Sequence, residues 1–176
     1  MPDIPNHHAR IYGTGNQPLY WTPLSTVSLA AGNMLRNPLP ILNRPILICP
    51  FPSASNLTQN TLLRTLEKLL DTAFSVEHVD MDKIHRNALI VLEKWKQGGE
   101  QEEGKAQMGK AIKGLAVCHQ FYEGDDDANH IGQTVQNEIV GVKAMQVEDA
   151  VRDALEHYGK ECQVVQGMFN VEACEI

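Results

Sequence analysis

The stretch from residue 78 to residue 85 holds the densest group of side chains that could carry chemistry. It contains two imidazoles and two carboxylates, on His78, Asp80, Asp82 and His85. If an extended strand runs through this stretch, its alternation places His78, Asp80 and Asp82 on one face. Such groups can bind a divalent metal ion or act as an acid–base pair. The competing interpretation is structural, because Asp82 is a good helix cap and the spacing matches no zinc-enzyme motif.

Cys49 is the other candidate, as a nucleophilic thiol. It ends a predicted strand and precedes a capped helix, whose dipole would favour a thiolate. However, Pro50 and Pro52 remove backbone donors that an oxyanion hole would use, and the neighbouring apolar run favours a buried structural thiol. The remaining cysteines, Cys118, Cys162 and Cys174, form no CxxC pair or zinc spacing with it, so all four are predicted to be free thiols.

The two remaining motifs are predicted to be loops, and the sequence therefore specifies no cofactor. Residues 13–16, Gly-Thr-Gly-Asn, are interpreted as a turn because no hydrophobic strand is predicted before them and no third glycine follows. The acidic run at residues 123–130 lacks the ligand order of a calcium loop and is typical of a solvated helix connection.

Composition narrows the class of protein. The chain has 176 residues, of which 43% are hydrophobic and 21% charged, as in ordinary globular proteins. Its net charge of −7 disfavours nucleic acid as a partner, because the field of the molecule repels polyanions. No apolar run approaches the roughly 20 residues that span a bilayer, and no export signal is visible. We therefore expect an acidic, soluble, cytoplasmic protein that contacts no membrane.

Residues 1–44 differ from the rest and are predicted to form an apolar, Pro- and Asn-rich arm. Only four charged side chains occur in this segment, while five prolines follow residue 17 within the first 45 residues. The apolar residues between Ile11 and Leu42 are too numerous for a solvated linker, so the arm must pack on a surface. That surface belongs either to its own domain or to a second copy or another protein. One short helix, near residues 26–35, is expected within the arm.

Residues 45–176 are predicted to form the globular domain. Strands at 46–49 and 76–81 flank a helix at 57–74 with apolar positions every three or four residues, which gives one β-α-β unit. Further helices are expected from Asp82 to Gly98, at 105–122, at 131–142 and at 147–158, while residues 160–176 stay open between a strand and a packed segment. The predicted fold class is α+β, a predominantly helical single domain with a small sheet.

These observations favour a non-enzymatic protein–protein interaction or regulatory protein that uses its apolar arm and forms homo-oligomers. The arm is the most conspicuous feature, whereas each catalytic constellation is incomplete. The alternative is a small metal-dependent or thiol enzyme that uses the stretch from His78 to His85 or Cys49.

Overall fold

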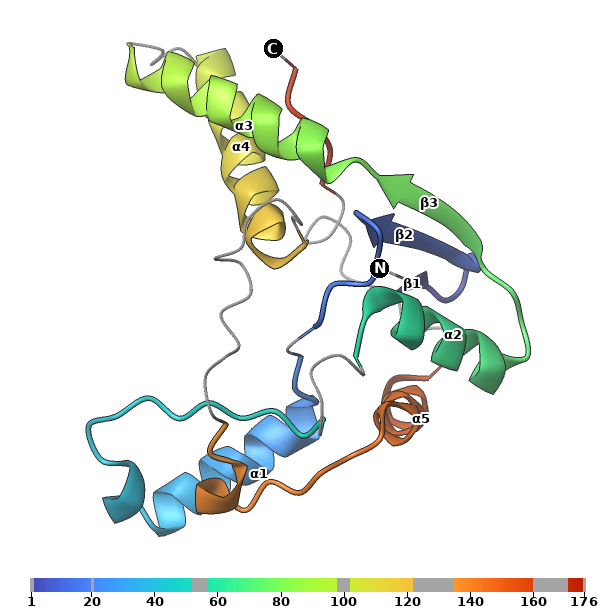
Figure 1. Ribbon diagram of the computed structural model, residues 1–176, viewed down its shortest axis with the longest axis vertical. Helices are drawn as coiled ribbons and strands as arrows, with labels where there is room; N and C mark the ends of the chain where they lie inside the picture. Colours follow the sequence, from blue (N-terminus) through green and yellow to red (C-terminus); the bar gives the residue numbers. More distant parts are fainter. Residues whose placement is uncertain are drawn as a thin grey trace. The chain divides into compact units, whose positions relative to one another are not determined.

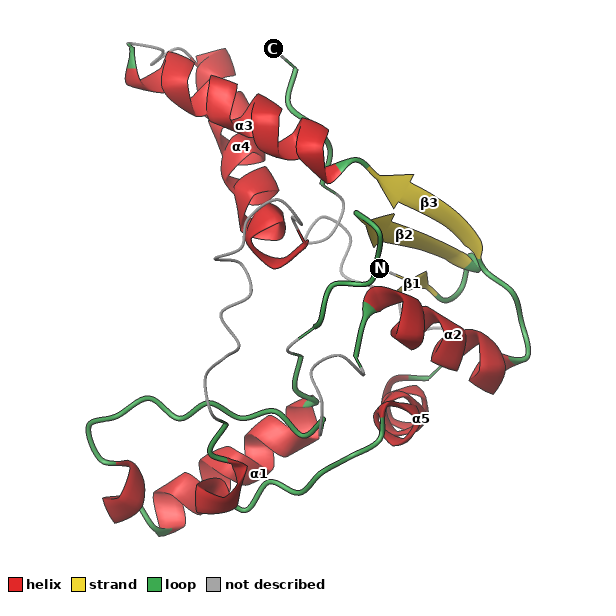
Figure 2. Cartoon of the chain, viewed as in Figure 1, coloured by secondary structure: helices red, strands yellow, loops and turns green. Residues whose placement is uncertain are grey.

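The computed structural model describes residues 2–19, 21–51, 57–97, 102–121, 135–159 and 171–175. Its helices and strands confirm the predicted fold class, a mainly helical α+β protein with a small sheet (Figures 1 and 2). In chain order they are β1 (Pro2–Asp3), β2 (His8–Tyr12), α1 (Leu24–Arg36), the 3-10 helix η1 (Leu39–Ile41), α2 (Gln59–Leu70), β3 (Ser75–Val79), α3 (Met81–Lys96), α4 (Glu102–Phe121), the 3-10 helix η4 (Asn137–Val140) and α5 (Val147–Tyr158).

The chain folds into two compact units. The first unit comprises residues 1–17, 73–128 and 160–176, and the second comprises residues 18–72 and 129–159. The predicted arm therefore contributes to both units: its strands belong to the first and α1 to the second.

The first unit is built on a three-stranded sheet in the order β1-β2-β3. β1 pairs with β2 in antiparallel fashion across a tight turn, in which the Asn6 backbone N–H and side-chain amide both donate to the Asp3 carboxylate. β2 and β3 are parallel, with His8 opposite Ser75 and Tyr12 opposite Val79. Ala9, Ile11 and Tyr12 are almost fully buried, so the central strand supplies the sheet's part of the core.

Helices α3 and α4 pack against each other in the same unit. Ala88, Val91, Ala111 and Cys174 form a core cluster there, and the Asn87 side chain donates to the Cys174 carbonyl over 2.6 Å. The ring of Tyr12 stacks on Phe121 with centroids 5.2 Å apart, which joins the central strand to the end of α4. Gly114 permits this close helix packing, because a Cβ there would lie 3.0 Å from Ile84 Cγ2.

The second unit contains two packed groups of helices. Around α1 and η4, Ala30, Val140 and Val142 form a small core, joined by Met34, Ile41, Ile46 and Ile48. The Asn33 side chain also donates to the Val140 carbonyl over 2.9 Å. The second group is α2 packed on α5, where Lys68 forms a 2.6 Å ion pair with Glu148.

The predicted strand at 46–49 is wrong: residues 45–50 form no strand. Their backbone groups bond to side chains and to the backbone of Gln136 and Met145 rather than to a neighbouring strand. Asn137 accepts from the Cys49 N–H over 3.0 Å and donates to the Cys49 carbonyl over 2.6 Å, and the Gln136 side chain accepts from the Leu47 N–H. The parallel neighbour of β3 is instead β2, which lies within the predicted arm.

The other predictions fare better. The helices predicted at 57–74, 105–122 and 147–158 correspond to α2, α4 and α5, and the short helix in the arm corresponds to α1. The helix predicted at 131–142 is wrong in its described part, residues 135–142, where only the 3-10 helix η4 forms at residues 137–140. Residues 13–16 do form a turn, although a strand precedes them, contrary to the expectation. The acidic run at 123–130 and most of residues 160–176 lie outside the described residues.

Candidate functional site

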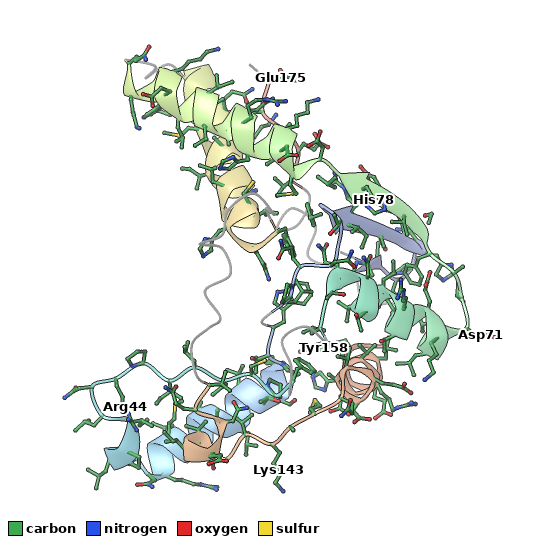
Figure 3. All side chains as sticks on the ribbon, in the orientation of Figure 1. Arg44, Asp71, His78, Lys143, Tyr158 and Glu175 are labelled. Carbon is green, nitrogen blue, oxygen red and sulfur yellow. The ribbon has the colours of Figure 1, made fainter. Side chains whose placement is uncertain are left out.

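The structure separates the side chains of the stretch from His78 to His85. β3 ends at Val79, so the alternation that would align Asp82 with His78 and Asp80 stops there. Asp80 caps α3 by accepting from the Lys83 N–H over 2.9 Å, and Asp82 lies in the first turn of that helix. His78, labelled in Figure 3, has its Nδ1 3.4 Å from the Gly13 carbonyl oxygen. Within the described ranges, no three His, Cys, Asp or Glu side chains form a group that could hold a metal ion.

Cys49 is buried, and both of its backbone polar groups are hydrogen-bonded. Its side chain is 7% exposed, its Sγ lies 3.8 Å from the Phe51 carbonyl oxygen, and Asn137 binds its backbone on both sides. This environment suits a structural thiol. Cys118 and Cys174 are also buried free thiols, while Cys162 lies outside the described residues. Burial, assisted by the carboxylate of Asp82, raises the pKa of Cys118 to about 11, which keeps that thiol protonated near neutrality.

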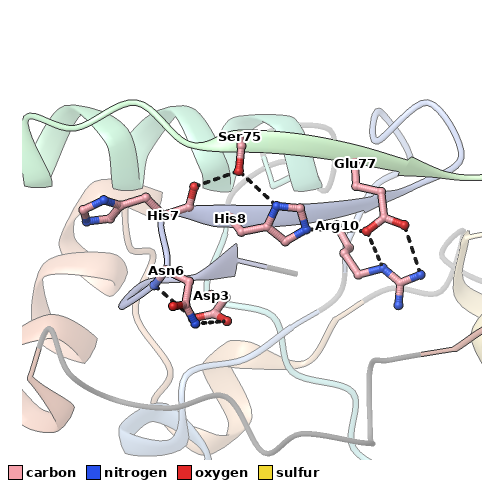
Figure 4. A network of polar contacts seen from close by, with 7 residues as sticks. All are labelled: Asp3, Asn6, His7, His8, Arg10, Ser75 and Glu77. Atoms are coloured by element: carbon pink, nitrogen blue, oxygen red, sulfur yellow. Dashed lines mark hydrogen bonds and ion pairs between the residues drawn. The ribbon is translucent and has the colours of Figure 1, made fainter.

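A polar network on the first unit's sheet was not foreseen (Figure 4). His8 lies between two residues of β3, with Nδ1 3.0 Å from Ser75 Oγ and Nε2 3.5 Å from Glu77 Oε2. Arg10 contacts the same carboxylate, with Nε 3.1 Å from Oε2. Parallel pairing brings these residues together across 67 positions of sequence, so local patterns could not have indicated the network.

The order hydroxyl, imidazole and carboxylate is that of a hydrolytic triad, but the surrounding bonds favour a structural role. Ser75 Oγ also lies 3.2 Å from the His7 carbonyl oxygen, and the Ser75 N–H already donates to that oxygen. The carboxylate of Glu77 is held by the Arg10 guanidinium as well as facing His8. We interpret the network as a cross-strand ladder that joins β2 to β3 and neutralises Glu77.

The most distinctive surface is apolar and lies in the second unit. It consists of large side chains that α1, η1 and the residue after η1 expose, and we call it the α1 surface. Its members are Leu24, Val27, Leu29, Leu35, Leu39 and Leu42. Leu35 and Leu39 are 85% and 80% exposed, the highest values among the large hydrophobic side chains that the structure describes.

The α1 surface exists because α1 is apolar on more than one side. Thr26 and Ala30 are its buried residues and face the unit's own core. At 100° per residue, Leu24, Val27 and Leu35 fall within an arc of about 80° on a different side of the helix. An ordinary surface helix carries charges opposite its core stripe. α1 carries none until Arg36, at its last position.

The segment that carries the α1 surface supplies only positive charges, on Arg36 and Arg44, while the carboxylate of Glu138 is exposed on η4, which packs against α1. No Asp or Glu occurs between residues 4 and 66, so 21 of the 22 acidic residues of the chain follow that segment. Arg36 and Arg44 are exposed next to the apolar side chains, and Arg44 is labelled in Figure 3. A protein with a net charge of −7 thus presents an apolar surface bordered by two cations.

Comparison with known proteins gives no match to a family model, a curated protein or a solved structure. In the described part of the chain, no helix combines the length and apolar character needed to cross a membrane.

Proposed function

We propose that this chain is a non-enzymatic interaction protein that binds another protein through the α1 surface. The observation that carries the proposal is the row of exposed leucines along α1 and η1, within a segment that contains no carboxylate. Burying one such side chain contributes about 1.5–3 kcal/mol, so several of them must be buried together to offset the cost of association and give a Kd below about 100 μM. Exposed apolar patches mark interaction sites in soluble proteins, and Leu24, Val27 and Leu35 share one side of α1.

Shape and charge together specify the partner. A helix that exposes apolar side chains at helical spacing is matched by a second amphipathic helix. Arg36 and Arg44 favour carboxylates beside the apolar residues of that partner helix. A second copy of this chain suits the surface less well, because it would bring its own two arginines to the same interface. The expected partner is therefore an acidic amphipathic helix of another protein.

A pair of labelled peptides tests this proposal. One is a 20-residue amphipathic helix with leucines on one side and glutamates on the other, and its twin carries lysines in place of the glutamates. Fluorescence anisotropy should show binding of the glutamate peptide with a Kd below about 100 μM and at least tenfold weaker binding of the lysine peptide. Added salt should narrow the difference between the two peptides.

Matched variants assign the binding to the α1 surface. The double variant Leu35→Ser, Leu39→Ser should lose most of the affinity for the glutamate peptide. Leu89→Ser, at an exposed position of α3, should leave the affinity unchanged. Circular dichroism confirms that both variants are folded. Absence of binding to either peptide would overturn the proposal. Self-association that is lost in the double variant would replace the expected partner with a second copy.

A further inference from the structure

We propose that the outer edge of β3 is a self-association site, at which β3 pairs with β3 of a second copy in antiparallel fashion about a two-fold axis at Val76. The two three-stranded sheets would then join into one sheet. This site lies on the first unit and rests on observations independent of the α1 surface.

The hydrogen bonds between β2 and β3 show which backbone groups of β3 point outward. The Ser75 N–H donates to the His7 carbonyl over 2.8 Å, and the Val79 carbonyl accepts from the Gly13 N–H over 3.1 Å. In a parallel pair, alternate residues direct both backbone groups to the same neighbour. Ser75, Glu77 and Val79 therefore bond to β2, and the N–H and C=O groups of Val76 and His78 point away from it.

This edge is open and lacks the usual protection against strand pairing. β3 is the last strand in the order β1-β2-β3, and residues 75–78 are all exposed, with Val76 46% exposed. Natural edges are commonly blocked by charged side chains, above all lysine, by proline, by a bulge or by a covering segment. β3 contains no lysine or proline, its one charged side chain, Glu77, is paired with Arg10, and its five residues pair with β2 in continuous register. The other edge strand, β1, has two residues and includes Pro2.

The side chains that face each other select the register of the two β3 strands. Three positions of the two-fold axis, at Val76, Glu77 or His78, let the outward backbone groups of Val76 and His78 form hydrogen-bonded pairs. An axis at Glu77 sets that carboxylate opposite its own copy, and an axis at His78 sets two imidazoles opposite each other and Val76 opposite Asp80. An axis at Val76 pairs Val76 with itself, Ser75 with Glu77 and Phe74 with His78. This last register sets no like charges or like imidazoles opposite each other and pairs Val76 with itself, while its outermost pair, Phe74 with His78, joins two aromatic rings.

The charges on the two copies determine how their association should depend on salt. Glu77 is already neutralised by Arg10, so the edge itself adds little repulsion. The remaining repulsion comes from the net charge of −7 on each copy. Association should therefore strengthen as salt is raised, because screening acts on these distant charges and leaves the backbone hydrogen bonds intact.

Cysteine trapping in the full-length protein tests the register. Val76→Cys should form a disulfide-linked dimer under mild oxidation, because residues opposite each other in an antiparallel pair have Cα atoms about 5.5 Å apart. Glu77→Cys is the matched control, since its Cα would lie more than about 7 Å from its copy and should not crosslink. The wild-type chain sets the background from its own thiols. Crosslinking through Glu77→Cys or His78→Cys but not Val76→Cys would overturn the proposed register.

A proline variant tests the edge itself. Val76→Pro removes an N–H that points away from β2, so the sheet within one copy should persist while the dimer is lost. Light scattering should give a salt-promoted dimer for the wild-type protein and a monomer for Val76→Pro, and circular dichroism checks folding. A wild-type monomer at millimolar concentration in high salt, together with no Val76→Cys crosslink above background, would overturn the proposal. If Val76→Pro does not fold, the Val76→Cys crosslink alone tests the proposal. Adding Leu35→Ser and Leu39→Ser to the Val76→Cys variant should leave the crosslink unchanged. This result would show that the edge of β3 associates independently of the α1 surface.

Discussion

At the scale of single residues, the two glycines inside α4 serve different purposes. A glycine within a helix costs up to about 1 kcal/mol relative to alanine because it leaves the unfolded backbone more freedom. A Cβ at Gly109 would have nothing within 4 Å, whereas a Cβ at Gly114 would lie 3.0 Å from Ile84 and 3.8 Å from Ala88. Gly114 is thus required by the close approach of α3, and Gly109 has no comparable role.

We expect opposite results from substituting the two glycines. Gly109→Ala should raise the free energy of unfolding by about 0.5–1 kcal/mol. Gly114→Ala should gain nothing, and Gly114→Val should lower the free energy of unfolding by about 1–3 kcal/mol through overpacking. Urea denaturation followed by circular dichroism measures all three changes. Stabilisation by Gly114→Val would contradict the packing of α3 on α4.

At the scale of elements, the start of α3 explains why the stretch from His78 to His85 resembles a metal site. The sequence indicated a cap correctly but assigned it to Asp82, two residues beyond its true position at Asp80. Helix boundaries are the least certain part of a sequence pattern, because a carboxylate in the first turn and a carboxylate at the cap both stabilise a helix start. Of the four candidate ligands, Asp80 and Asp82 therefore stabilise the start of α3, and His85 lies within the same helix.

The cap assignment gives a prediction with two matched controls. Asp80→Ala should lower the free energy of unfolding by about 1 kcal/mol, because the Lys83 N–H loses its acceptor. Asp80→Asn should restore most of that loss, since asparagine caps as well as aspartate. Asp82→Ala should cost less than Asp80→Ala, as its carboxylate acts mainly on the helix dipole. Thermal melts measure each change, and a larger loss in Asp82→Ala would return the cap to that residue.

Other elements show where sequence patterns stop being informative. Periodicity identified α2, α4 and α5, since each carries a stripe of apolar residues that its own sequence displays. The segment around Cys49 has the composition of a buried strand, yet the amide side chains of Gln136 and Asn137 bind its backbone instead of a neighbouring strand. Those partners lie 88 or 89 positions away, which no local pattern reveals. β2 was not predicted, because prolines on both sides of it made residues 1–44 resemble a continuous arm.

The candidate surfaces were predictable to different degrees. Apolar density in the arm pointed to the α1 surface, but only the packing of Thr26 and Ala30 shows which side of α1 is left exposed. The network of His8, Arg10, Ser75 and Glu77 and the open edge of β3 both depend on long-range pairing. Sequence alone could name none of those residues as neighbours.

At the scale of the whole molecule, charge is unevenly distributed along the chain. Residues 4–66 contain no carboxylate, and the later residues carry the acidic excess that sets the net charge of −7. The α1 surface belongs to the first of these segments. An acidic partner would therefore meet favourable charges at the α1 surface and repulsion over most of the rest, which directs binding to one place on the molecule.

The part that residues 1–44 play in the whole fold leads to the last prediction. An arm that only covers a finished domain can be removed, and residues 45–176 would then fold alone. However, β2 lies between β1 and β3, and its Ala9, Ile11 and Tyr12 are at most 2% exposed. A variant that lacks residues 1–44 should therefore lose its cooperative thermal transition and aggregate. Two point variants locate the cause: Ile11→Ala should cost about 2–5 kcal/mol of unfolding free energy, whereas Leu29→Ala, on the α1 surface, should change it by less than about 0.5 kcal/mol. A monomeric 45–176 fragment with a sharp melting transition would show instead that the arm is dispensable for folding.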